Sequence, residues 1–204
     1  MQPFKIRYRA KKNSFYKILP WAYISDYAEG VVVQKNGLLQ RTFAFRGPDL
    51  ESAAALYIND MCLFINDIVK SLGTGWAFCF ENNHFQTRDY QGASFTNTAA
   101  YLIDKEREFT YQSYGAHFDT NYYLTIVYES PLDISTKITN IFFKEKTIGL
   151  DSSIKEAVKK LLAVTDDICA LLAKKMTIVP LDTNETLTYL KQSISKSGYP
   201  VQNQ

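Results

Sequence analysis

Side chains that could carry out chemistry are few in this 204-residue sequence, and none stands in a known catalytic pattern. A phosphate-binding loop needs spaced glycines ahead of Lys and Ser or Thr, because backbone N–H groups of the loop wrap the phosphates. The chain has 9 Gly but neither a Gly-Lys pair nor a Gly-x-Gly-x-x-Gly spacing. We therefore expect no nucleotide hydrolysis by this chain alone.

The two histidines, His84 and His117, do not indicate a catalytic site either. Nucleophilic catalysis needs a His beside Ser or Cys, and a metal site needs closely spaced His or Cys ligands. These histidines are 33 positions apart and belong to neither a His-Glu-x-x-His nor a Cys-x-x-Cys motif. Local hydrogen bonding is the favoured interpretation, and a deep cleft around either ring would revive an enzymatic one.

Carboxylates that could act in pairs occur at two places. Asp166 and Asp167 are adjacent in a predicted long helix, and Glu106 and Glu108 alternate with basic residues in another. Charge runs of this kind are typical of solvated helix faces. We expect both to be structural.

The N-terminal segment combines positive charge with aromatic residues. It has no acidic side chain before Asp26, so its charge is near +6 while the rest of the chain is near −4. Basic and aromatic residues together favour nucleic-acid binding, docking on an anionic membrane surface, or anchoring to a membrane-embedded subunit. A flexible terminus without a role is the remaining alternative. The residues assigned to partner or membrane docking are Lys5, Arg7, Arg9, Lys11, Lys12, Lys17 and Trp21.

A β-hairpin and a sharp corner must position whatever site exists. Asn36-Gly37 separates the strand-like runs 31–35 and 38–45, and this dipeptide favours a type I′ turn. Arg46-Gly47-Pro48-Asp49 then ends the strand. We interpret it as a structural corner in which Gly47-Pro48 forces the bend, Asp49 caps the next helix and Arg46 pairs locally. A ligand clamp is the alternative.

The remaining elements predict an α+β fold, in which a mostly antiparallel sheet of β-β-α-β-α-β order is covered by helices and followed by a helical C-terminal part. Capping-box patterns at Ser153/Glu156 and Asp182/Glu185 predict two helix starts. Residues 82–95 read as a loop, and 132–149 are ambiguous between a loop and a short helix. The other predicted elements are helices at 50–72 and about 97–114 and strands at 75–81, 121–128 and 177–179.

Composition limits the class of protein. A hydrophobic content of 46% with 14 Tyr, 13 Phe and 2 Trp excludes a mostly disordered chain. No apolar run approaches the ~20 residues of a membrane-spanning helix, and no secretory signal fits the start. Three widely spaced cysteines argue against a disulfide scaffold and favour a reducing compartment. We expect a basic aromatic segment over 1–29 and one domain over 30–198.

A series of short segments, in order along nearly the whole chain, forms a further pattern. The longest runs from Thr42 to Ser52 and contains the Arg46–Asp49 corner. The others are Leu19-Pro20-Trp21-Ala22, Gly30-Val31-Val32-Val33, Lys35-Asn36-Gly37, Leu72-Gly73-Thr74-Gly75-Trp76-Ala77, Gly115-Ala116-His117-Phe118, Tyr122-Tyr123-Leu124-Thr125 and Glu185-Thr186-Leu187-Thr188-Tyr189-Leu190. Together they resemble the start of the TrbE-type conjugal transfer ATPases, in the CagE/TrbE/VirB family of type IV secretion.

The resemblance implies an amino-terminal domain that, in the family, precedes a RecA-like motor carrying the nucleotide-binding motifs. It implies that ATP and Mg²⁺ bind the motor, which we expect to be absent here, so no catalytic, cofactor-binding or metal residue is carried over. It also implies docking of the motor to inner-membrane subunits such as TrbD, a peripheral location at the cytoplasmic face of the inner membrane, and a homo-oligomer in the full-length protein. The alternative function is a nucleic-acid-binding module that uses the basic N-terminal segment.

Overall fold

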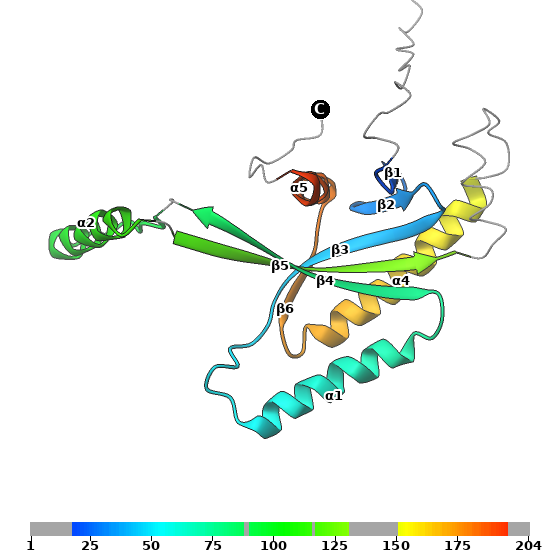
Figure 1. Ribbon diagram of the computed structural model, residues 1–204, viewed down its shortest axis with the longest axis horizontal. Helices are drawn as coiled ribbons and strands as arrows, with labels where there is room; N and C mark the ends of the chain where they lie inside the picture. Colours follow the sequence, from blue (N-terminus) through cyan, green and yellow to red (C-terminus); the bar gives the residue numbers. More distant parts are fainter. Residues whose placement is uncertain (1–17, 88–89, 116, 131–150, 196–204) are drawn as a thin grey trace, which may run out of the picture.

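A computed structural model describes residues 18–87, 90–115, 117–130 and 151–195 (Figure 1). Within these ranges the chain forms one six-stranded antiparallel sheet with helices on both of its faces, which confirms the α+β class. The elements in chain order are β1 (Trp21–Ile24), β2 (Val31–Gln34), β3 (Leu38–Arg46), α1 (Ala55–Ser71), β4 (Trp76–Thr87), α2 (Thr98–Ser113), β5 (His117–Glu129), α4 (Asp151–Leu172), β6 (Thr177–Pro180) and α5 (Thr183–Ile194).

Strand β3 is the centre of the sheet. The strand order is β1-β2-β3-β5-β4, and β6 pairs with the last part of β3, on residues Phe43 to Arg46. β1 lies within the segment 1–29 that the sequence placed ahead of the domain, yet it pairs with β2 as an edge strand. The ordered sheet therefore begins at Trp21 rather than at residue 30.

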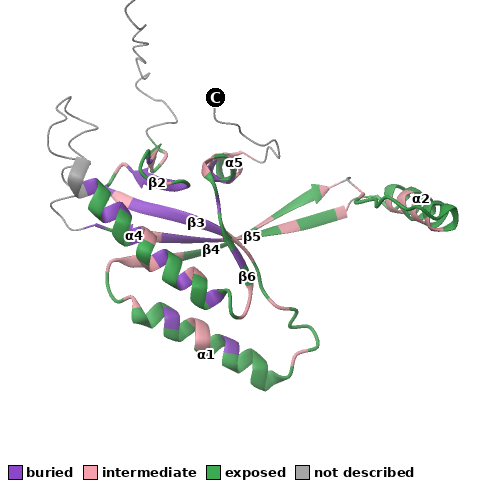
Figure 2. Cartoon of the chain, turned by 180° about the vertical axis from the view of Figure 1, so that it is seen from behind, coloured by how far each residue is buried: buried purple, intermediate pink, exposed green. Residues whose placement is uncertain are grey.

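Helices cover the two faces unequally. Figure 1 shows α1 and α4 on one side of the sheet and α5 on the other. β2 contributes side chains to the packing on both faces, because successive side chains of a strand point to opposite faces. Val31 and Val33 pack in the cluster under α4, whereas Val32 packs with Leu181 and Leu190 beside α5. All three valines are almost fully buried, so this edge of the core is closed on both faces (Figure 2).

An ion pair fixes α4 to the central strand. The Arg41 side chain donates from Nη1 to Asp166 Oδ1 at 2.6 Å and to Thr165 Oγ1 at 2.8 Å. Arg41 is nearly buried, and the Asp166 carboxylate is mostly exposed. The prediction that Asp166 only solvates its helix is therefore wrong, because this carboxylate neutralises a cation held on the core face of β3.

The predicted hairpin is present, but its turn differs. Val31 pairs with Arg41 and Val33 with Leu39, which confirms the strand pairing. Only Gly37, with φ of +85°, has a positive φ in the connection, and its N–H bonds to the Gln34 carbonyl at 3.0 Å. A type I′ turn needs positive φ at both central residues, so the prediction of that turn is wrong. A three-residue connection ending in a left-handed glycine replaces it.

The corner after β3 also differs from its prediction. Helix α1 begins at Ala55 with Ala54 as N-cap, five residues beyond Asp49, so Asp49 does not cap this helix. Instead the Asp49 carboxylate accepts a hydrogen bond from the Glu51 N–H at 3.0 Å, within the corner itself. Gly47 and Pro48 lie in the irregular stretch between β3 and α1, as expected for a bend.

Of the two helix starts predicted from capping-box patterns, one is present. Asp182 and Glu185 form the predicted capping box of α5, with both reciprocal hydrogen bonds present. Ser153 does not start α4, because that helix already begins at Asp151. The ambiguous stretch 132–149 lies outside the described residues.

Strands β4 and β5 are longer than predicted and form a projecting arm. Their pairing runs without a break from Trp76↔Tyr128 to Thr87↔His117, so residues 82–87 are strand and not loop. β3 accompanies β5 only as far as Phe45↔Tyr122. Beyond that point two strands continue alone, and α2 lies at their far end (Figure 1).

We expect Gly30→Ala to lower the free energy of unfolding by clearly more than Gly73→Ala. Both glycines have left-handed φ, +67° and +68°, where an L side chain costs about 1–2 kcal/mol. A Cβ at Gly30 would also overlap the backbone oxygen of Leu181, whereas nothing lies within 4 Å of one at Gly73. Urea unfolding of the two variants measures the difference. Equal losses of unfolding free energy would contradict the close contact between Gly30, just before β2, and Leu181, shortly before α5.

We expect Asp166→Asn to lower the free energy of unfolding by roughly 1–2 kcal/mol, because the nearly buried Arg41 loses its charged acceptor. Asp167→Asn on the adjacent position is the matched control and should change stability by less than about 0.5 kcal/mol, as exposed surface changes usually do. Thermal and urea denaturation of both variants provide the test. Equal effects would show that the Arg41 pair adds no net stability.

Candidate functional site

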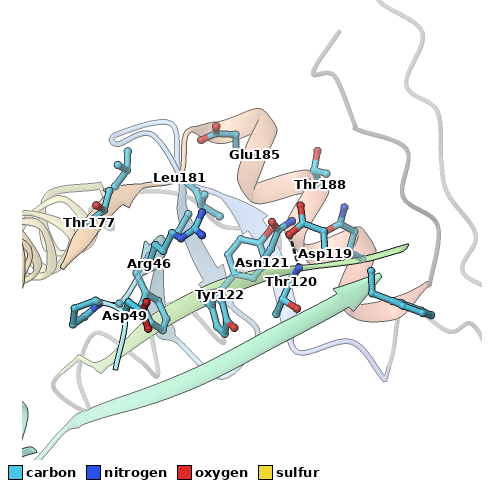
Figure 3. Close-up of a pocket in the computed structure, with 18 of the residues that line it drawn as sticks. Arg46, Asp49, Asp119, Thr120, Asn121, Tyr122, Thr177, Leu181, Glu185 and Thr188 are labelled. Carbon is cyan, nitrogen blue, oxygen red and sulfur yellow. Dashed lines mark hydrogen bonds between the residues drawn. The ribbon is translucent and has the colours of Figure 1, made fainter. Parts of the chain in front are cut away.

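A wide groove opens where β3 leaves β5, at the base of the arm (Figure 3). Its volume is about 1310 Å³, and its walls come from the end of β3 and the corner, the arm part of β5, β6 and α5. Val179 and Leu181 are its apolar residues on the β6 side. The polar residues are Arg46, Asp49, Asp119, Thr120, Asn121, Thr177, Asn184, Glu185, Thr188 and Gln192.

The groove brings one cation together with three carboxylates. Arg46 is exposed, and among the described residues its side chain has no ion-pair partner, so the predicted local pairing does not appear there. In Figure 3 the Arg46 side chain extends toward Leu181 from the end of β3. Asp119 and Glu185 lie on the arm and on α5, and Asp49 lies on the corner. The residues predicted as a structural corner thus form one wall of a polar surface cavity.

A tyrosine hydroxyl ties the arm to α5 behind the groove. Tyr189 OH donates to Glu81 at 2.8 Å and lies 3.2 Å from Thr125 Oγ1, and its ring packs against that of Tyr123. Burial, followed by the Glu81 contact, raises the pKa of Tyr189 to about 12. Burial also raises the pKa of Tyr123. These phenols therefore stay neutral at physiological pH, and Tyr189 acts as a hydrogen-bonding group between the arm and α5.

His117, just after α2, makes the predicted local contact, whereas His84 lies within β4 and contacts the neighbouring strand β5. His84 Nδ1 lies 2.8 Å from Thr120 Oγ1, and its ring stacks on Phe118. His117 Nε2 lies 2.6 Å from the Tyr111 carbonyl and stacks on the Tyr111 ring. Neither His lines the groove. In the described part of the chain, no three His, Cys, Asp or Glu side chains are grouped so that they could hold a metal ion.

Helix α2 at the tip of the arm presents an apolar surface to solvent. None of its residues is buried, and Leu102 and Phe109 are 62% and 75% exposed (Figure 2). The half-buried positions of α2 are Ala100, Asp104, Glu108 and Tyr111, at steps of three and four. Leu102 and Phe109 are seven residues apart and project from the opposite side of the helix.

The docking residues predicted at the N-terminus are only partly described. Trp21 lies in β1, half-buried, and packs against the cluster that contains Val32 and Leu190. It is therefore anchored in the sheet, while its role in docking stays a prediction. The six basic residues assigned with it lie outside the described residues: Lys5, Arg7, Arg9, Lys11, Lys12 and Lys17.

Sequence reasoning missed the groove and the apolar side of α2. The groove residues come from four separate segments that only the fold brings together, and no spacing in the sequence announces them. The α2 surface did have a signal, because Leu102 and Phe109 share a helical face with no predicted neighbour. Among the described residues, no helix is both long and apolar enough to cross a membrane.

The sequence is similar to proteins of type IV secretion and conjugal transfer. Residues 30–135 match a family model described as the N-terminal domain of the type IV secretion system ATPase VirB4/TrbE. A "Conjugal transfer protein TrbE" of Rhizobium radiobacter is 27% identical over 88% of this chain and 22% of its own length. A relative in Sinorhizobium fredii (strain NBRC 101917 / NGR234), named as the first portion of a probable conjugal transfer protein TrbE, is 33% identical over 60% of this chain and 83% of its own length. The chain thus spans about a fifth of the length of the Rhizobium radiobacter relative.

We expect Tyr189→Phe to destabilise the fold below pH 10 and to have a smaller effect as the pH rises above that value. The phenol titrates near 10 when unfolded and at about 12 when folded. The stability it contributes is therefore complete below pH 10 and is lost between 10 and 12, where the unfolded state releases its proton first. Unfolding free energies of both proteins from pH 8 to pH 11 provide the measurement. A difference that stays constant or grows with pH would contradict the buried, neutral phenol.

Proposed function

The chain belongs to the VirB4/TrbE family of type IV secretion ATPases, as its N-terminal domain, and from this premise we propose that it docks the ATPase to inner-membrane subunits of the secretion channel. It acts as an assembly domain through protein contacts and hydrolyses no nucleotide by itself. ATP and Mg²⁺ belong to the motor region of full-length relatives. The domain sits peripherally at the cytoplasmic face of the inner membrane.

The exposed apolar side of α2 is the observation that carries this proposal. Soluble domains rarely leave large apolar side chains in contiguous exposed positions unless a partner covers them. Leu102 and Phe109 are both more than half exposed, and the helix that bears them stands clear of the sheet body (Figure 1). An arm of two strands holds this helix away from the core, where a subunit in the membrane can reach it.

The polar groove supports a second contact at the base of the same arm. Arg46 offers an unpaired guanidinium among the described residues, and guanidinium groups bind carboxylates with defined geometry. A subunit that lies along the arm would meet the apolar helix first and the charged groove second. The basic N-terminal segment would add attraction to anionic lipid, at about 1 kcal/mol for each basic residue near the surface.

Vesicle flotation tests the proposal. The purified chain is mixed with vesicles that contain the small TrbD-like inner-membrane subunit of its own transfer system, and with empty vesicles of the same lipids. We expect it to float with the subunit vesicles and to bind them roughly tenfold more weakly when Leu102 and Phe109 are both changed to Glu. Full burial of a Leu or Phe side chain contributes about 1.5–3 kcal/mol, so losing part of this burial at both positions accounts for a tenfold effect.

Thr110→Glu is the matched control, because it places an acidic residue about 100° around α2 from Phe109. It should leave flotation unchanged. Equal flotation with empty vesicles would show that the chain binds lipid and would contradict docking to the subunit. Absence of flotation, together with salt-sensitive DNA binding that is lost on deletion of residues 1–17, would favour the nucleic-acid-binding module.

A further inference from the structure

Among the described residues, the outer edge of β4 is an open hydrogen-bonding surface. β4 has 12 residues, all of them paired with β5 on one side, and β4 is the last strand in the order of the sheet. Within the described ranges, no strand pairs with its other side. An open edge of this kind presents alternating N–H and C=O groups that another extended chain can bind.

The end strands β1 and β6 are protected, and the stretch of β5 that extends beyond β3, residues 117–121, is short and carries Asp119, so β4 offers the longest open edge among the described residues. β1 has four residues, and its register with β2 is irregular between Trp21 and Tyr23. β6 also has four residues and ends at Pro180, which has no N–H to offer. Short length, irregular pairing and proline all discourage edge-to-edge association. β4 is three times as long, pairs regularly with β5 and contains neither Pro nor Lys, and Glu81 is its only charged residue.

Side chains on both faces of β4 can contribute to such a contact. Phe80 is 60% exposed on the face turned toward α1, and Phe85 is 38% exposed on the face turned toward α5. Cys79 and His84 are exposed beside them. A strand added at this edge would bury apolar side chains above and below the sheet while satisfying its backbone groups. Strand addition of this type gains affinity from the main chain and specificity from alternate side chains.

We propose that β4 pairs antiparallel with β4 of a second copy of this chain, about a two-fold axis at Asn82. A two-fold axis perpendicular to the sheet relates the same face of the two copies. Side chains alternate between faces along a strand, so residues that lie opposite each other must differ in number by an even amount. Centring the pair on Glu81 would set two carboxylates directly opposite, which is destabilising. Centring it on Asn82 avoids this and keeps residues 77–87 paired, whereas centres at Phe80 or His84 shorten the overlap.

The Asn82 register is self-complementary. It places Phe80 opposite His84 of the second copy, an aromatic pair on one face. On the other face it places Cys79 opposite Phe85 and sets Glu81 opposite Asn83, whose amide can donate to the carboxylate. Aromatic pairs and hydrogen-bonded polar pairs across strands are the contacts that stabilise antiparallel sheets. No like charges lie directly opposite each other in this arrangement, and the two Glu81 residues are diagonal neighbours at about 7–8 Å.

The molecular mass in solution tests the proposal on the whole chain. We expect a dimer by sedimentation equilibrium at high micromolar concentration, and a dissociation constant raised at least tenfold by Asn82→Lys, which sets two lysines opposite each other at the axis. Asn66→Lys is the matched control: it makes the same chemical change at an exposed position of α1, outside the β4 edge. Circular dichroism of both variants checks that the arm stays folded.

A disulfide trap tests the register independently. In a Cys62→Ser background, Phe85→Cys places a new thiol opposite the native Cys79 of the second copy, where cross-strand Cβ atoms lie about 4.5–5.5 Å apart. We expect oxidation to give a covalent dimer for Phe85→Cys and none for Gln86→Cys, whose side chain points to the opposite face. A monomeric wild-type chain, a dimer unaffected by Asn82→Lys, or equal cross-linking of the two cysteine variants would overturn the proposal. Pairing of this edge with a strand of another protein, while the chain alone stays monomeric, would also overturn it.

Discussion

The length of β3 is the constraint on which the rest of this structure depends. β3 is hydrogen-bonded to β5 along one side and to β2 and β6 along the other, and helices cover both of its faces. Phe43 and Thr42, pointing to opposite faces, are both fully buried, so a one-residue change in register would exchange the two faces and separate Arg41 from Asp166. Where β3 ends at Arg46, the sheet narrows from several strands to two. The groove and the free-standing arm both follow from that single termination.

Local signals in the sequence predicted the elements whose stability is local. The capping box of α5 and the glycine at the end of the β2–β3 connection each depend on residues within three positions of one another. The outer half of β4 had no comparable signal. Residues 82–87 are polar or aromatic with both faces exposed, so the alternation that marks a half-buried strand is absent. β1 was missed for a related reason, because a four-residue edge strand is defined by the partner it pairs with.

Contacts between distant segments account for what the sequence could not predict about the site. Arg41 and Asp166 are 125 positions apart, and Tyr189 reaches Glu81 across 108 positions. Each residue alone had an adequate local explanation, as a strand residue or a solvated helix charge, and nothing in the spacing argued against it. The Arg46–Asp49 corner illustrates the same limit. Its residue types suit a bend, and they also become the wall of a groove only because β5 and α5 arrive beside them.

The arm joins the two proposed surfaces into one mechanical unit. Only residues 114–116 separate α2 from β5, and β5 is paired with β4 along the whole arm, so a contact that orders β4 also restrains the helix at its tip. In a two-fold pairing about Asn82, Thr87 of one copy lies opposite Ala77 of the other, and each arm tip reaches the start of the partner's β4. The apolar sides of the two α2 helices would then be held at a fixed separation along one axis. A membrane assembly that carries two linked α2-binding sites at this separation would bind the second α2 at a raised effective concentration, without any new contact.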